Sequence, residues 1–143
     1  MKKILVMLMM LFMMTGCGES EIKDLDISKA SNAVEQTLTG METIEPATLD
    51  DVYDIDLELL EEYVIKQNSD GEMYAIILTN NKSEVKDDME EYFDKVRDFN
   101  TAYSPETVKL IDERLEKEIG NYLIYIVSND SEKVYQDIIN TME

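Results

Sequence analysis

Residues 63–78 read YVIKQNSDGEMYAIIL, and this stretch decides the fold. Two apolar runs, residues 63–65 and 74–78, flank a polar segment that ends in Asp70-Gly71. β-Branched and aromatic residues on both sides of an Asp-Gly turn predict a β-hairpin. We therefore expect residues 61–67 and 72–79 to form neighbouring antiparallel strands.

A second apolar run, YLIYIV at residues 122–127, predicts a further strand because it is rich in aromatic and β-branched residues and carries no charge. It follows Gly120-Asn121, a pair suited to a tight turn. The segment before that turn permits two interpretations. Apolar and charged residues alternate over 115–119 as in a strand, whereas the spacing over 108–119 and the helix formers at 113–118 also suit a helix.

The clearest helical pattern lies between these two regions. Apolar residues recur there at steps of three and four, which predicts a helix over 82–100 with one face toward the core: Val85, Met89, Tyr92, Val96, Phe99 and Tyr103. Asn81 and Glu84 have the spacing of a capping box at its start. Further helix starts are predicted at Ser104-Pro105 and at Asp130-Ser131.

The chain is therefore expected to have an α+β fold with a small, mainly antiparallel sheet. About four strands are predicted, at 61–67, 72–79, 114–119 and 121–128, with helices 82–100 and 131–142 covering one face. A modest amphipathic helix near 28–40 would pack on an edge or link to a tether, and a short helix followed by a turn is expected within 49–60.

The N-terminus has the features of an export signal. Lys2 and Lys3 precede an apolar run over residues 4–14, which as a helix would span about 17 Å, well short of a ~30 Å hydrocarbon core. The next residues, MTGC at 14–17, resemble the bacterial lipobox, with Met14 in place of Leu. That resemblance implies cleavage before Cys17 and a diacylglyceryl group, with acyl chains such as palmitate, on its thiol. The alternative is an ordinary secretory signal with an incidental cysteine.

Three segments follow from this interpretation. Residues 1–16 are the signal peptide, residues 17–26 are the lipidated Cys17 with an acidic tether, and residues 27–143 form a single domain. Two acyl chains hold a protein on a membrane far more firmly than one. Because Cys17 is the only cysteine, its lipidation leaves no thiol for a disulfide.

Composition excludes several functions. The chain has 13 Lys and Arg, 32 Asp and Glu, a net charge of −19 and no histidine. Without histidine there is no Ser-His or Cys-His catalytic pair and no His-ligated zinc. The strong negative charge opposes nucleic-acid phosphates, so nucleic acid is not an expected partner.

The order of these features resembles the bacterial domain of unknown function family 4358, found largely in Gram-positive lipoproteins. The matching text runs over about residues 48–140: EYVI at 62–65 and the strand at 74–78, the acidic helix, YSPE at 103–106, GNY at 120–122 with its strand, and a closing helix. In such sequences the segment before Gly-Asn-Tyr is usually a strand, which favours a second hairpin. The resemblance implies no activity, cofactor or catalytic residue.

Each candidate site in the sequence also has a simpler structural interpretation. The acidic residues between 50 and 62 could bind calcium, but from Asp51 the glycine of an EF-hand loop is missing, and a solvated acidic surface is the better explanation. Ser131 with Lys133 is a poor catalytic pair, because residues two apart on a helix diverge. Gly120-Asn121 is an anion nest or a turn. Four strand tyrosines mark either a binding surface or the edge of the core: Tyr63, Tyr74, Tyr122 and Tyr125.

The sequence thus predicts a lipid-anchored lipoprotein on the extracytoplasmic face of a bacterial membrane. Its domain is expected to be a non-enzymatic binding or assembly module of the cell envelope, with no cofactor and with an unknown envelope protein or ligand as partner. A small carboxylate-dependent envelope enzyme and a weak divalent-cation-binding protein are the alternatives.

Overall fold

The computed structural model of the protein describes residues 24–142, which form one five-stranded antiparallel sheet and the helices around it. The signal peptide and Cys17 lie outside the described residues, so their assignment stays a prediction. The strands run in the order β1-β2-β3-β5-β4, with bounds β1 Glu42–Thr43, β2 Glu62–Gln67, β3 Met73–Leu78, β4 Leu115–Ile119 and β5 Tyr122–Val127.

Both predicted hairpins are present and are joined through their inner strands. β2 pairs with β3, β4 pairs with β5, and β3 pairs with β5 from Met73 opposite Val127 to Leu78 opposite Tyr122. All six residues of β5 are buried, as are the first five of β3. A strand that is apolar on both faces needs cover on both. Complete burial of each large aliphatic side chain contributes about 1.5–3 kcal/mol.

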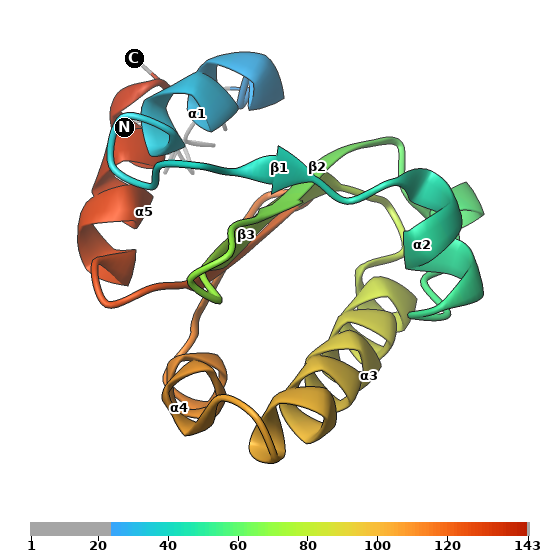
Figure 1. The fold of residues 1–143 in the computed structure, drawn as a ribbon. Coiled ribbons are helices and arrows are strands. Elements are labelled where there is room, and N and C mark those ends of the chain that lie inside the picture. Colours follow the sequence, from blue (N-terminus) through green and yellow to red (C-terminus); the bar gives the residue numbers. More distant parts are fainter. Residues whose placement is uncertain (1–23, 143) are drawn as a thin grey trace, which may run out of the picture.

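Two helical layers provide that cover (Figure 1). α1 (Ile27–Val34) and α5 (Ser131–Asn140) pack on one face, whereas α2 (Pro46–Asp51), the 3-10 turn η1 (Leu57–Leu59), α3 (Lys82–Thr101) and α4 (Pro105–Asp112) lie on the other. The α+β class is therefore confirmed. The prediction that the helices of residues 82–100 and 131–142 share one face was wrong. They lie on opposite faces, because the central strands β3 and β5 are apolar on both faces and each face requires a helix to cover it.

The structure also decides the ambiguous segment before Gly120. Residues 115–119 form strand β4, which pairs along β5 although its residues are strong helix formers. β4 is an edge strand, and its exposed Glu118 accepts hydrogen bonds from Lys82 and Lys86 of α3. These hydrogen bonds, that of Lys82 first, lower the pKa of the Glu118 carboxyl to about 2.

Helix bounds differ from the predictions mainly at the N-terminal end. α1 stops at Val34, and turns carry the chain to the buried Leu38 and to Gly40, whose φ of +70° reverses its direction. The two-residue strand β1 was not predicted. α3 starts where the capping box predicted, but the Asn81 side chain makes no cap hydrogen bond, and its backbone N–H donates to Thr79 Oγ1 at 2.9 Å.

Candidate functional site

The apolar stripe of α3 leaves the core before the helix ends. Val85, Met89 and Tyr92 are buried as predicted, whereas Phe99 is 73% exposed and Tyr103, just beyond the helix, is 81% exposed. The prediction of a core-facing stripe is therefore wrong for its last two residues. A helix of 20 residues is about 30 Å long, whereas a six-residue strand spans about 20 Å, so the end of α3 runs past the sheet.

A groove of about 590 Å³ lies beside this exposed end of α3. Its walls are the chain after α2, the C-terminal half of α3, the β2–β3 turn and the start of α4. Val52, which is 57% exposed, and Phe99 are its most exposed apolar residues. The Phe99 and Tyr103 rings lie 5.9 Å apart between centroids, so they extend the apolar surface along the same helix end.

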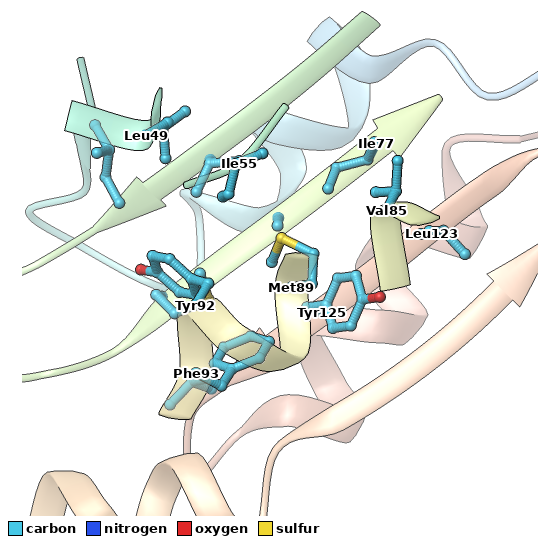
Figure 2. Close-up of a cluster of buried hydrophobic side chains, with 14 of the residues drawn as sticks. Leu49, Ile55, Ile77, Val85, Met89, Tyr92, Phe93, Leu123 and Tyr125 are labelled. Atoms are coloured by element: carbon cyan, nitrogen blue, oxygen red, sulfur yellow. The ribbon is translucent and has the colours of Figure 1, made fainter. Parts of the chain in front are cut away.

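The floor of the groove is aromatic and continuous with the core. Tyr53 packs edge-on against Tyr92 at 4.7 Å between ring centroids, Tyr92 against Phe93 at 5.1 Å, and Phe93 against Tyr125 of β5 at 5.6 Å. Figure 2 shows Tyr92 and Phe93 below the sheet strands, with Met89 and Tyr125 beside them. Burial raises the pKa of the Tyr92 phenol, so this group stays neutral. The floor is thus a packed aromatic surface, and Arg114, paired with Glu90 and Glu116, lies 4.4 Å from the centroid of its Phe93 ring.

The opposite wall is held in place by hydrogen bonds in the β2–β3 turn. Asn68 Oδ1 accepts from the backbone N–H groups of Asp70 and Glu72, and its Nδ2 donates to Glu72 Oε2 at 3.0 Å. Gly71 has φ +84°, and a Cβ there would lie 2.8 Å from Thr107 Cγ2 of α4. The turn and α4 therefore approach each other as closely as a glycine permits, which fixes the width of the groove at this end.

Lys95 is the only cationic side chain that lines the groove within the described residues. It donates to Asp54 and to Glu91, the latter pair at 2.9 Å, and these hydrogen bonds, that of Asp54 first, raise the pKa of Lys95. Its charge is therefore already balanced by two carboxylates. Glu72 lines the same groove, so the lining offers no surplus of positive charge to a ligand.

The strand tyrosines do not form a binding surface. Tyr74, Tyr122 and Tyr125 are buried and Tyr63 is half-buried, so the hypothesis of an exposed tyrosine on a sheet face was wrong. Tyr122 and Tyr125 are three residues apart along β5 and belong to the cores on different faces of the sheet.

A polar cluster lies in the other layer, where α1 packs on the sheet. The Tyr74 hydroxyl lies 2.7 Å from Ser31 Oγ and donates to Glu35 Oε1 at 3.1 Å, and Lys66 Nζ donates to the same oxygen at 2.5 Å. The combination of serine, tyrosine and lysine is one that catalytic sites use. Burial raises the pKa of Tyr74, however, so its phenol is held protonated, and the cluster serves to fix α1 to β2 and β3.

The remaining sequence candidates do not converge on a site. Among residues 24–142, no three side chains of His, Cys, Asp or Glu lie close enough together to hold a metal ion. Asp56 accepts from the backbone of Glu58 as the cap of η1. Lys133 pairs with Asp137 at 3.2 Å, and Ser131 is the first residue of α5. The catalytic pair of Ser131 and Lys133 therefore finds no support in these contacts.

Gly120-Asn121 forms the turn between β4 and β5, with φ +56° at Gly120. Lys82 Nζ donates to the Gly120 carbonyl at 2.9 Å, and the backbone N–H of Thr79 donates to the Asn121 carbonyl at 3.0 Å. The turn thus presents carbonyl oxygens to donors, which is the opposite of an anion nest. The turn interpretation is confirmed.

The groove was not identified from the sequence. Phe99 was assigned to the core because periodicity shows which side of a helix is apolar and not how far the sheet beneath it extends. Val52 lies among aspartates and gave no apolar pattern. The run of acidic residues on both sides of Val52 was the one usable signal, and it was interpreted as a metal site or a solvated surface.

Comparison with protein families places the chain in one of them. The model of the family described as Domain of unknown function (DUF4358) matches residues 33–128, about two-thirds of the sequence, so the chain belongs to this family. The match starts earlier than the resemblance suggested, inside α1, and stops before α5. It includes the sheet and all four walls of the groove. Comparisons with curated proteins and with solved structures find no match.

No helix within residues 24–142 combines the length and apolar character required to cross a bilayer.

Proposed function

We propose that the protein is a bacterial lipoprotein, anchored through Cys17 to the extracytoplasmic face of the membrane, and that its domain is a non-enzymatic module that binds another envelope component through the groove. The MTGC motif at residues 14–17 supports the anchor. The groove supports the binding role, because concave apolar surfaces with a few polar groups are where proteins bind ligands and partners.

One observation carries this proposal: large apolar side chains remain exposed beside a groove whose floor is packed. Removing a phenylalanine side chain from water is worth about 1.5–3 kcal/mol, so a fold that leaves Phe99, Tyr103 and Val52 exposed together forgoes several kcal/mol. The other residues of the same stripe show that α3 can bury its apolar face. A partner that covers this end of α3 would recover the missing burial.

The place where the chain enters the domain supports a groove that faces away from the membrane. Residue 24 leads into α1, which lies on the face of the sheet opposite α3 and α4 (Figure 1). From Cys17 to residue 24 the chain can span at most about 25 Å. An anchor on Cys17 would therefore keep the α1 and α5 layer near the membrane and direct the groove away from it.

The anchor is tested by fractionating cells that produce the wild-type chain or the Cys17→Ala variant. The wild-type protein is expected in the membrane fraction, cleaved and acylated, whereas the variant is expected to keep its leader and to carry no acyl group in mass spectrometry. Equal release of both would contradict the anchor.

The binding role is tested by site-specific crosslinking in cells. Ser69→Cys places a thiol on the exposed β2–β3 turn at the groove, and Gln136→Cys places one on the exposed side of α5 in the opposite layer. With Cys17 lipidated, each variant has a single thiol for a photoactivatable reagent. A discrete crosslinked product is expected from Ser69→Cys and not from Gln136→Cys. The same pattern from both positions would contradict a role for the groove.

A further inference from the structure

The rim of the groove is acidic on three sides. On α3, Glu91 pairs with Lys95 of the groove wall, and the exposed Asp98 lies two turns later on the same side of the helix as Glu91. Asp51 and Asp54 flank the exposed Val52 at the end of α2.

The β2–β3 turn contributes the third acidic side. Asp70 is exposed at its tip, and Glu72 lines the groove itself. Two cations near this rim are already paired with carboxylates: Lys95 with Asp54 and Glu91, and Arg97 with Asp112 at 3.0 Å. Lys109 of α4 lies near Asp70 and Glu72 in a neighbouring pocket, where Glu106 adds a further carboxylate. The groove therefore combines an apolar floor with a negative surrounding field.

This charge discriminates among occupants. Anionic lipid headgroups, nucleic acid and acidic peptides would all be repelled by the rim. A second copy of the chain would also be repelled, because each copy carries a net charge of −19. A Lys- or Arg-bearing segment gains attraction from the same carboxylates, and this attraction weakens as salt is added.

The polar groups of the lining favour a polypeptide over a simple cation. Gln67 and Ser69 are exposed at one wall, and Asn100 and Ser104 lie half-buried at the other. Amide and hydroxyl side chains donate and accept, which matches the alternating N–H and C=O groups of a peptide backbone. The apolar pair Val52 and Phe99 provides a seat for a large side chain between these walls.

We infer that the groove binds a cationic polypeptide segment of a partner protein, with one large apolar side chain seated between Val52 and Phe99 and with Lys or Arg residues on the acidic rim. This inference rests on the proposed function, since it names the class of partner for the same groove. Phe99 is the central contact. Asp98 and Asp54 supply attraction at the rim.

The test uses the purified full chain and three synthetic peptides in isothermal titration calorimetry. The probes are Lys-Lys-Leu-Phe-Lys-Lys, its acidic counterpart Glu-Glu-Leu-Phe-Glu-Glu, and Lys-Lys-Ser-Ser-Lys-Lys, which keeps the charge and lacks the apolar pair. We expect the first to bind with an affinity that falls as salt rises, and the other two to bind at least about tenfold more weakly.

Matched variants locate the binding. Phe99→Ser is expected to weaken the binding of the first peptide at least about tenfold, since buried aromatic anchors dominate such interfaces. Asp98→Asn is expected to weaken it several-fold and to reduce its salt dependence. Glu132→Gln makes the same change of charge on the exposed side of α5 and should leave binding unchanged. Because Phe99 and Asp98 are exposed, thermal melts of these variants are expected to match the wild type.

Each remaining outcome contradicts the inference in a different way. Equal binding of both cationic peptides, unaffected by Phe99→Ser, would show that charge alone attracts them. Tighter binding of the acidic peptide, or a dimer in sedimentation that Phe99→Ser abolishes, would show that the occupant is of another kind. If no peptide binds while Ser69→Cys still crosslinks in cells, the inference of a cationic partner segment is wrong and the proposed function stands. If neither peptide binding nor crosslinking is found, the inference and the proposed function are both wrong.

Discussion

The close approach of the β2–β3 turn to α4 gives a sharp test of the groove's geometry. Gly71 has φ +84°, a left-handed conformation that costs an L residue about 1–2 kcal/mol. An added Cβ would also lie 2.8 Å from Thr107 Cγ2, and Thr107 is buried with its Oγ1 2.7 Å from Ser104 Oγ. Overpacking of this kind adds about 1–3 kcal/mol. Gly71→Ala is therefore expected to lower the free energy of unfolding by about 2–5 kcal/mol.

Gly40 is the matched control for this substitution. It also has a positive φ, +70°, but nothing lies within 4 Å of the Cβ that it would acquire. Gly40→Ala is thus expected to cost the conformational part alone, about 1–2 kcal/mol. Both free energies are measured by urea unfolding, where an unchanged slope with a shifted midpoint identifies a change in stability.

A double-mutant cycle separates the contact from the backbone. Thr107→Ala removes the two nearest atoms that the new Cβ would meet and leaves only the Cβ of residue 107 at 3.1 Å, so in that background the cost of Gly71→Ala should fall close to that of Gly40→Ala. Equal costs for the two glycines in the wild-type background would refute the close approach of the turn to α4. The width that we assign to this end of the groove would then be wrong as well.

Three further predictions concern stability. Phe99→Ser is expected to change the free energy of unfolding by less than about 0.5 kcal/mol, because the ring is exposed; a large loss in urea unfolding would place it in the core. Hydrogen bonds from Lys82 and then Lys86 lower the pKa of Glu118 from 4.5 to about 2. The ionised Glu118 therefore stabilises the folded state fully above pH 4.5, and this contribution is lost as the pH falls through about 2. Glu118→Gln should therefore flatten the acid limb of a stability profile between pH 4.5 and 2, and an unchanged limb would argue against the ion pairs. Tyr74→Phe removes a buried hydroxyl that bonds to α1 and should cost about 1–2 kcal/mol, and no loss in thermal melts would show that the cluster does not fix α1.

The strands could be predicted because their chemistry is local. Residues 74–78 and 122–127 carry β-branched and aromatic side chains with turn residues beside them, and each predicted strand agrees with the structure to within a residue or two at its ends. Residues 113–119 show the limit of local preference. Strong helix formers there become β4, because pairing with the buried β5 outweighs an intrinsic helix preference of a few tenths of a kcal/mol per residue.

The layers could not be predicted by the same means. The apolar faces of α3 and α5 are each evident from spacing, yet spacing does not say which side of a sheet a helix covers. The uninterrupted apolar runs of β3 and β5 did contain that information, because strands with no polar face are buried on both sides. The lipid anchor on Cys17 stays a prediction, since it depends on a motif outside the described residues.

The candidate site arises because α3 is longer than the strands on which it packs, which is also why the sequence pattern wrongly placed Phe99 in the core. Up to Tyr92, α3 buries its apolar stripe against the core; Val96 is half-buried, and the stripe continues into the exposed Phe99. Had the exposed end been only the frayed terminus of a helix, polar residues would suffice there. Instead the chain has apolar rings at the exposed end, Phe99 and Tyr103, beside a groove whose aromatic floor belongs to the core. The turn that encloses the groove is fixed by Asn68. An ordered apolar surface of this kind within a rim of carboxylates is the feature that supports the proposed binding role.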